Sequence, residues 1–212
     1  MTPRGLFITF EGIDGCGKTT QLILLEKHLR SKNIRPLVTR EPGGNRLSEK
    51  IRSLVLDPGN RDMGKKTELL LYLASRAQHV SEAILPALKK GRTVLCDRFS
   101  DATIAYQAGG RALDAGAVIA LDRFATDSLR PDLTFLFDLP VREAFARLKR
   151  SGKKSDRLEK GGAAFMGRVR KAYLALAKKE PRRIAVINAA RSVDKIHSDV
   201  LTIFNKRRKS HD

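Results

Sequence analysis

The chain is poor in the residues from which metal clusters and disulfide frameworks are built. Its 212 residues include two cysteines, Cys16 and Cys96, and four histidines. The cysteines lie far apart and neither has a close-spaced partner, so the sequence indicates neither a disulfide framework nor a zinc site. No apolar run approaches the roughly 18 residues of a membrane span, and the first residues lack the apolar region of a secretion signal. We therefore expect a cytoplasmic protein.

Acidic residues are also scarce relative to basic ones. The chain has 42 Lys+Arg against 23 Asp+Glu, which leaves a net charge of +19, and residues 141–212 carry +14 of it. Such a surplus suggests an anionic partner but does not choose between nucleic acid, an acidic membrane surface and phosphorylated metabolites. The basic stretch 206–209 is most simply a solvated tail, placed at about 205–212, and few aromatic residues accompany it for nucleic-acid stacking.

Short β-rich apolar runs alternate along the chain with longer segments that are compatible with helices. This alternation is typical of a parallel sheet covered on both faces, so we expect a five-stranded, doubly wound α/β fold in one domain of residues 1–212. The expected strands are 6–10, 37–39, 93–96, 133–137 and 184–187. The expected helices are 18–31, 45–56, 66–90, 100–107, 115–129, 141–150, 161–179 and 193–206, with Pro86 kinking or shortening the third.

A phosphate-binding loop follows the first expected strand and opens the first expected helix. It matches G-x-x-x-x-G-K-[ST] in full. Its glycines let backbone N–H groups surround phosphate oxygens at a helix N-terminus, Lys18 is expected to reach the β and γ phosphates, and the Thr19 hydroxyl is expected to bind Mg²⁺. The sequence thus predicts nucleoside triphosphate binding by this P-loop. The nucleotide-binding residues are predicted to be Gly12, Ile13, Asp14, Gly15, Cys16, Gly17, Lys18, Thr19 and Thr20.

A P-loop alone does not identify the reaction, because ATPases, GTPases and small-molecule kinases share it. Further strings occur in order at the ends of expected strands, where open α/β sheets bind ligands. Together with the P-loop they resemble bacterial thymidylate kinases, which phosphorylate dTMP to dTDP with MgATP, and the likeness runs through most of the chain. The strings are Thr39-Arg40-Glu41-Pro42-Gly43-Gly44, Asp97-Arg98-Phe99, Ala105-Tyr106-Gln107 and Asp156-Arg157-Leu158-Glu159.

On the acceptor side, the resemblance implies that Arg98 holds the dTMP phosphate with support from Asp14 in the P-loop. The planar guanidinium fork suits phosphate oxygens, although a structural salt bridge is the alternative for this arginine. Arg52 matches a further arginine that contacts dTMP, with an exposed helix face as the alternative.

The resemblance also implies a set of base-reading and sugar-reading residues. Arg76 is expected to donate to the thymine base, and Tyr72, four residues earlier on the same helix face, to stack on it or to pack in the core. Thr103 and Gln107 match residues that hydrogen-bond the pyrimidine edge. Tyr106 matches an aromatic residue that crowds the sugar 2′ position and favours deoxyribose.

On the donor side, the resemblance implies MgATP. Asp97 matches an acidic residue near Mg²⁺ beside Thr19, or it orients the arginine that follows it or caps the next helix. The adenine is expected near Asn188, where Arg142 or Arg147 stacks on the ring.

Relatives carry a catalytic arginine either in the P-loop or in a mobile lid. The variable P-loop positions here hold no basic residue, whereas the expected lid at about 147–159 is rich in them. The lid therefore offers Arg150 and Arg157 as catalytic arginines. Together with Lys18 and Arg98 they make up the predicted catalytic residues. Arg147 and Lys153 are the alternatives within the lid.

Two other functions remain open at this point. Another pyrimidine nucleoside monophosphate kinase would share the scaffold, and a nucleic-acid-dependent P-loop ATPase would explain the basic charge but leave the acceptor strings without a role. Relatives are homodimers that pack through helices, and the segments 66–90 and 115–129 are the candidates here.

Overall fold

The computed structural model describes residues 4–152 and 161–209. Within these ranges one five-stranded parallel sheet forms, in the order β2-β3-β1-β4-β5. This confirms the expected α/β fold and all five expected strands to within a residue at each end. The strands are β1 (Phe7–Glu11), β2 (Leu37–Arg40), β3 (Val94–Asp97), β4 (Leu133–Asp138) and β5 (Ile184–Asn188).

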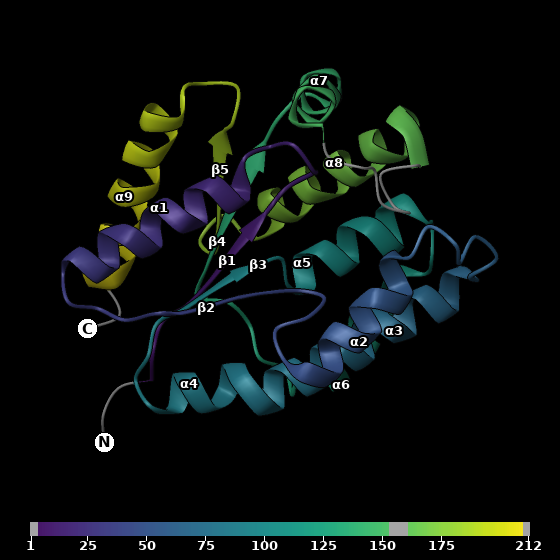
Figure 1. The fold of residues 1–212 in the computed structure, drawn as a ribbon, viewed down its shortest axis with the longest axis horizontal. Helices are drawn as coiled ribbons and strands as arrows, with labels where there is room; N and C mark the ends of the chain where they lie inside the picture. Colours follow the sequence, from purple (N-terminus) through teal and green to yellow (C-terminus); the bar gives the residue numbers. More distant parts are fainter. Residues whose placement is uncertain (1–3, 153–160, 210–212) are drawn as a thin grey trace.

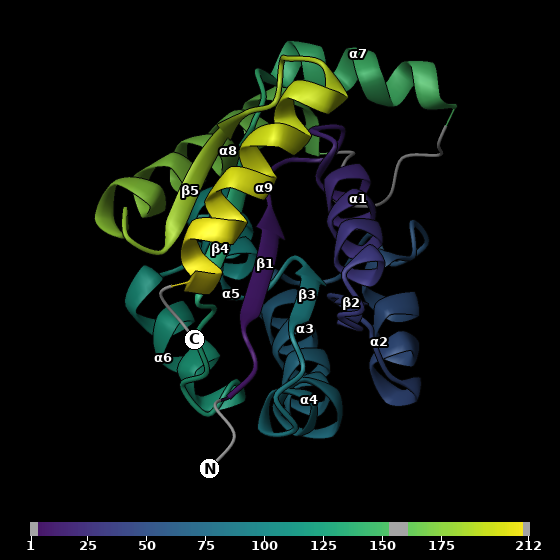
Figure 2. The ribbon, with the colours of Figure 1, turned by 90° about the vertical axis from the view of Figure 1, so that its left-hand side faces the viewer.

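Helices cover both faces of the sheet (Figures 1 and 2). They are α1 (Lys18–Ser31), α2 (Arg46–Leu56), α3 (Lys65–His79), α4 (Leu85–Lys89), α5 (Ser100–Thr103), α6 (Ala115–Ala125), α7 (Val141–Ser151), α8 (Gly162–Lys179) and α9 (Val193–Lys209), with π-helical turns η1 (Val80–Ile84) after α3 and η2 (Ile104–Gly110) after α5. Helices α1 and α9 pack against each other on one face, and α8 packs against η2 on the other. Figure 2 shows the carboxyl end of β1 leading into the loop that opens α1. Residues of this loop line two cavities of the structure.

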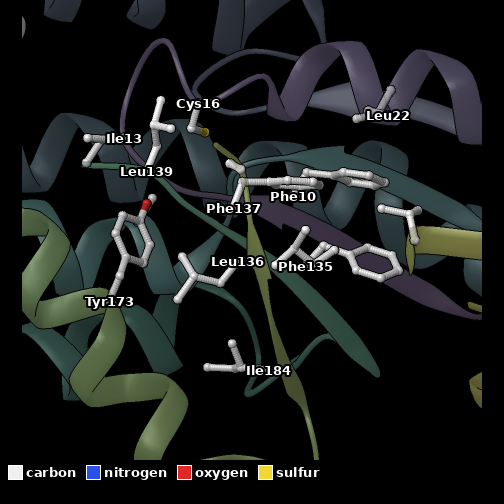
Figure 3. Close-up of a cluster of buried hydrophobic side chains, with 14 of the residues drawn as sticks. Phe10, Ile13, Cys16, Leu22, Phe135, Leu136, Phe137, Leu139, Tyr173 and Ile184 are labelled. Carbon is white, nitrogen blue, oxygen red and sulfur yellow. The ribbon is translucent and has the colours of Figure 1, made fainter. Parts of the chain in front are cut away.

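The central strand β1 is buried on both faces, as a continuous apolar run in a parallel sheet predicts. Phe10 packs in the main core with Leu25 of α1, whereas Phe7 packs in a second cluster with Ile84 of η1. Figure 3 shows part of the main core, where Cys16 of the P-loop lies among apolar side chains. This cysteine is only 1% exposed and packs as a small apolar side chain inside the tight turn of the loop.

The helix expected over 66–90 is one rod in three parts, α3, η1 and α4 (Figure 1). Pro86 is the second residue of α4 and cannot donate the backbone bond that an α-helix requires. The preceding turn widens to a π-helix, in which the Leu85 amide donates to the Val80 carbonyl. The proline thus changes the helix locally without ending it.

Three expected helix ends are wrong. The helix expected over 193–206 continues to Lys209. The helix expected over 115–129 stops at Ala125, because Asp127 and Ser128 adopt left-handed backbone angles, φ 50° and 59°, that no α-helix contains. The segment expected as 100–107 continues to Gly110 through η2.

The expected tail at about 205–212 is helical through Lys209, the last described residue. Its basic side chains occupy the last turn of α9, where they complement the negative end of the helix dipole. No helix in residues 4–152 and 161–209 is long and apolar enough to cross a membrane.

Candidate active site

The P-loop joins β1 to α1 in a conformation that requires its glycines. Gly12, Gly15 and Gly17 have φ values of 139°, 82° and 89°. A Cβ at Gly12 would lie 2.6 Å from the Phe137 carbonyl oxygen, so a side chain is excluded there. Gly17 is the N-cap of α1 and supplies no side-chain hydrogen bond to the first turn, whose amides therefore face the loop. The loop and the helix N-terminus together form a cradle for phosphate oxygens.

A cavity of about 670 Å³ opens over this cradle. Seven of the nine predicted nucleotide-binding residues, Asp14 through Thr20, line it, whereas Gly12 and Ile13 shape the loop from behind. The far wall comes from α7 and from the segment between β5 and α9, near the predicted adenine position. We call this the donor cavity, and its other lining residues are Gln21, Arg147, Leu148, Ser151, Arg191, Ser192, Val193 and Ile196.

A second cavity, of about 290 Å³, adjoins the first and shares Asp14, Lys18 and Thr19 with it. We call it the acceptor cavity. All eight residues predicted to bind the acceptor line it, although they come from segments far apart in the sequence. They are Asp14, Arg52, Tyr72, Arg76, Arg98, Thr103, Tyr106 and Gln107.

One carboxylate oxygen links the two cavities. Asp14 Oδ1 accepts from Lys18 Nζ at 3.1 Å and from Arg98 Nη2 at 2.8 Å. Burial favours the neutral acid, but Arg98 and Lys18 outweigh it and hold the pKa of Asp14 well below its usual range. Asp14 is therefore ionised at any working pH. Its Oδ1 binds the donor-side cation, Lys18, and the acceptor-side cation, Arg98, at the same time.

Arg98 is held from its backbone and from its guanidinium. Its φ of 72° lies in the left-handed region, which is uncommon for a residue with a side chain. The next amide, that of Phe99, donates to Glu11 Oε1 at 2.7 Å, and the Tyr173 hydroxyl bonds to Glu11 Oε2 at 2.7 Å. Arg98 Nη1 donates to that same Tyr173 hydroxyl at 3.2 Å and to the Gly12 carbonyl at 3.1 Å. The buried Glu11 thus braces the backbone and the side chain of the arginine.

Burial raises the pKa of Glu11 to about 8, and the nearby Asp101 adds to the shift. Between the usual carboxyl pKa of about 4.3 and pH 8, the folded protein holds a proton that the unfolded chain has lost. The free energy of unfolding is therefore expected to fall by up to about 1.4 kcal/mol per pH unit across this window relative to Glu11→Gln, and to level off above it. Urea unfolding of both proteins at several pH values measures the difference, and parallel curves would contradict the shift.

Arg76 is buried and tightly partnered, with 2% of its side chain exposed. Its Nε donates to Glu41 Oε2 at 2.6 Å, and its Nη1 donates to Asp122 Oδ1 at 2.5 Å and to Thr103 Oγ1 at 2.7 Å. His79 Nδ1 lies 3.0 Å from the other oxygen of Glu41. These partners fix the plane of the guanidinium at the wall of the acceptor cavity.

The remaining acceptor residues serve the cavity and the fold together. Tyr72 lines the cavity and also packs against the core, so both of its expected roles fit. Arg52 lies in the cavity wall and donates to the Pro42 carbonyl at 2.7 Å, which rules out a merely exposed helix face. The Tyr106 hydroxyl accepts from Arg98 Nη2 at 3.2 Å, and the arginine lies 5.0 Å from its ring centroid.

Thr19 and Asp97 meet at the boundary of the two cavities. The Thr19 hydroxyl donates to Asp97 Oδ2 at 2.5 Å. Helix α5 begins after Phe99 and has no side-chain cap, so the alternative of a capping Asp97 is wrong. One hydroxyl and one carboxylate suit Mg²⁺, which takes few protein ligands and completes its shell with phosphate and water. In the described ranges no group of three or more His, Cys, Asp or Glu could hold a metal by itself.

The lid candidates are divided in the structure. Arg157 and Lys153 lie outside the described residues. Arg150 is exposed in the last turn of α7, donates to the Ala146 carbonyl and lines neither described cavity. Arg147, one turn earlier, lines the donor cavity and donates to the Ala189 carbonyl at 2.9 Å.

Several supporting residues escaped sequence analysis. Glu41 stands inside the string 39–44, Tyr173 lies in the expected helix 161–179, and Arg191 lies close to the predicted adenine position at Asn188. Asp122 had no signal, because it is one polar position in an otherwise ordinary helix and reaches Arg76 only through the packing of α6 on α3.

The comparisons with known proteins agree with this geometry. A family model described as thymidylate kinase matches residues 10–200. A thymidylate kinase of Pseudomonas syringae pv. tomato is 48% identical over 196 residues, with 92% of this chain and 93% of that protein covered. One of Pelobacter propionicus is 49% identical over 202 residues, with 93% and 92% covered.

Among solved structures, the crystal structure of thymidylate kinase from Ehrlichia chaffeensis superimposes with a TM-score of 0.75 at 34% identity, with 96% of this chain and 99% of that chain covered. The resemblance noted in the sequence is thereby confirmed over almost the whole chain. With its P-loop cradle and adjoining acceptor cavity, this chain belongs to the thymidylate kinase family.

Proposed function

We propose that this chain transfers the γ-phosphoryl group of ATP to the phosphate of dTMP and so produces dTDP. The observation that carries the proposal is the junction of the two cavities at Asp14, Lys18 and Thr19. A triphosphate on the P-loop and a monophosphate on Arg98 would approach each other there. Family membership supports the identity of both substrates.

The chemistry asks the protein mainly for position and positive charge. The acceptor is already an anionic phosphate, so no strong general base is required, and transfer needs donor and acceptor in line. Lys18 neutralises charge on the β and γ phosphates. Arg98 binds the acceptor phosphate in a fixed direction, and Asp14 keeps the two cations from collapsing onto one phosphate.

Mg²⁺ would be held by Thr19 and Asp97 together with the nucleotide phosphates. It would supply charge neutralisation across the β and γ phosphates. The contact between these two side chains supports this site, because their oxygens already converge at the cavity boundary.

The lid arginines are the remaining catalytic candidates. We expect Arg150→Ala and Arg157→Ala to lower kcat by about 10³-fold, as for other arginines that close on a transferring phosphoryl group, with little change in KM for dTMP. Arg147→Ala is the comparison: its place in the donor cavity predicts a raised KM for ATP instead. Steady-state kinetics with each substrate varied separates the two patterns. Near-normal turnover of both Arg150→Ala and Arg157→Ala would show that the lid assignment is wrong.

We further propose a homodimer in which α3 and α6 form the contact. Apolar side chains stand exposed on both helices: Phe124 is 86% exposed, Leu70 54% and Leu121 39%. Covering them removes apolar surface from water, which is the main favourable contribution to most protein association.

A cytoplasmic location is proposed as well, because Cys16 and Cys96 are both buried free thiols and suit a reducing compartment.

Acceptor-dependent release of ADP tests the proposed reaction against its competitors. With ATP present, dTMP is expected to support faster turnover than dUMP, dCMP or CMP. A preference for any of these over dTMP would replace the proposed acceptor. ADP release that depended on DNA or RNA, and on no nucleoside monophosphate, would point to a nucleic-acid-dependent ATPase instead.

A further inference from the structure

We infer that Glu68 determines the base specificity of the acceptor cavity, because it fixes the side-chain amide of Gln107 with its carbonyl oxygen toward the base. This inference rests on the proposed function, in which the acceptor cavity holds a pyrimidine nucleotide. Glu68 itself does not line the cavity. It acts through Gln107 and is therefore a positioning residue.

Glu68 lies at the start of α3 and its side chain is buried, with 1% exposed. Its carboxylate accepts hydrogen bonds from two side chains of the segment around η2, Arg111 and Gln107. Arg111 donates through Nε to Oε1 and through Nη2 to Oε2, both at 3.0 Å. Gln107 Nε2 donates to Glu68 Oε1 at 2.9 Å. Arg111 thus pairs with both oxygens of the carboxylate, and Gln107 donates a separate hydrogen bond to one of them.

This contact decides which way the Gln107 amide points. A carboxylate accepts hydrogen bonds and offers no proton, so it can bind only the NH₂ end of the amide. The opposite end, the carbonyl oxygen Oε1, accepts no hydrogen bond within residues 4–152 and 161–209. Gln107 is buried yet lines the acceptor cavity, so this carbonyl is the polar group it offers there.

Arg76 offers the opposite kind of group on the same wall. Its Nε and Nη1 are taken by Glu41, Asp122 and Thr103, whereas Nη2 donates to no residue in the described part of the chain. The acceptor cavity therefore presents a fixed donor and a fixed acceptor. Both are locked by buried carboxylates that ligand binding does not need to move.

The Arg76 donor and the Gln107 carbonyl together complement thymine and uracil but not cytosine. Thymine and uracil carry an oxygen at position 4 and an N–H at position 3, which complement an arginine donor and a glutamine carbonyl. Cytosine carries an amino group at position 4 and a bare nitrogen at position 3, so it would face donor against donor and acceptor against acceptor. Sites built around such hydrogen bonds reject the wrong partner strongly, because buried polar groups are left unpaired.

The test compares kcat/KM for dTMP, dUMP and dCMP in the wild-type enzyme and in Glu68→Met. Methionine has similar length but no carboxylate, and its thioether is only a weak hydrogen-bond acceptor, so the Gln107 amide is no longer held in one orientation. The ratio of dTMP to dCMP is expected to fall by about 10-fold or more, in line with the loss of one buried pairing. The ratio of kcat/KM for dTMP to kcat/KM for dUMP is expected to stay the same, since both bases present the same oxygen at position 4 and the same N–H at position 3.

Arg111→Met is the matched control. It removes the other partner of the same carboxylate but leaves the Glu68–Gln107 contact, so the dTMP to dCMP ratio should persist even if the melting temperature falls. Equal loss of activity toward all three acceptors in Glu68→Met, or an equal change of ratio in both variants, would overturn the inference. Absence of dTMP phosphorylation by the wild type would instead refute the proposed function.

A measurement on the wild type keeps the inference testable if Glu68→Met does not fold. In 3-methyl-dTMP a methyl group replaces the hydrogen on N3, from which Gln107 Oε1 is expected to accept a hydrogen bond. This nucleotide should bind at least about 10-fold more weakly than dTMP in calorimetry. Equal affinity would show that the carbonyl does not meet this position. That result would overturn the inference while leaving dTMP phosphorylation intact.

Discussion

Lys18→Ala is expected to lower kcat for phosphoryl transfer by at least about 10²- to 10³-fold, the range for loss of one group that stabilises transition-state charge. Lys18 is one of the three residues that line both the donor and the acceptor cavity, and only 6% of it is exposed. Burial and Arg98 both oppose its charge, yet Asp14 and Asp97 outweigh them and raise its pKa, so the ammonium persists. Rapid-quench measurement of dTDP formation reports the chemical step directly.

Lys27→Ala is the matched control for this prediction. Lys27 is exposed on the same helix and lines neither described cavity, so its loss should leave turnover within about twofold of wild type, as surface substitutions usually do. Melting temperatures of both variants separate lost chemistry from lost folding. A Lys18→Ala enzyme that folds and turns over at the wild-type rate would refute the role of this lysine.

Arg98→Lys is expected to weaken dTMP binding by about 10- to 100-fold, since charge-assisted hydrogen bonds contribute about 1.5–3 kcal/mol and lysine cannot reproduce the planar fork. The guanidinium is held at four points by Asp14, Gly12, Tyr106 and Tyr173, which direct it toward the acceptor phosphate. Lysine keeps the positive charge and so isolates the effect of geometry. Titration calorimetry with dTMP measures the change.

Thymidine is the internal control, because it carries the same base and sugar without the phosphate. Its affinity should be nearly the same in wild type and in Arg98→Lys. If both ligands weakened by the same factor, Arg98 would be supporting the shape of the cavity. If neither weakened, the phosphate would be bound elsewhere.

The parts of the fold that follow local patterns could be predicted from the sequence. A strand buried on both faces must be a continuous apolar run, which predicts β1. The P-loop must have glycines where φ is positive, and these glycines predict where α1 begins. Helix ends were less secure. The turn after Ala125 depends on left-handed residues, Asp127 and Ser128, and neither is a glycine that would mark it.

The acceptor cavity could be predicted in its lining but not in its support. Arg76, Arg98 and Gln107 stand in recognisable strings, and the structure brings them to one cavity. Their orientation comes from long-range partners such as Asp122 and Glu68, which are single polar positions on helices. Nothing local distinguishes a buried carboxylate of this kind from a solvated one, because its burial is decided by how α3, α6 and η2 pack.

Formation of labelled dTDP from dTMP and ATP labelled at the γ-phosphate tests the central claim most directly. The wild-type chain is expected to transfer the label to dTMP in the presence of Mg²⁺, and Lys18→Ala to lose at least about 99% of that rate while Lys27→Ala keeps it. Label that appeared only as inorganic phosphate, or transfer that survived loss of Lys18 in a folded protein, would contradict the account.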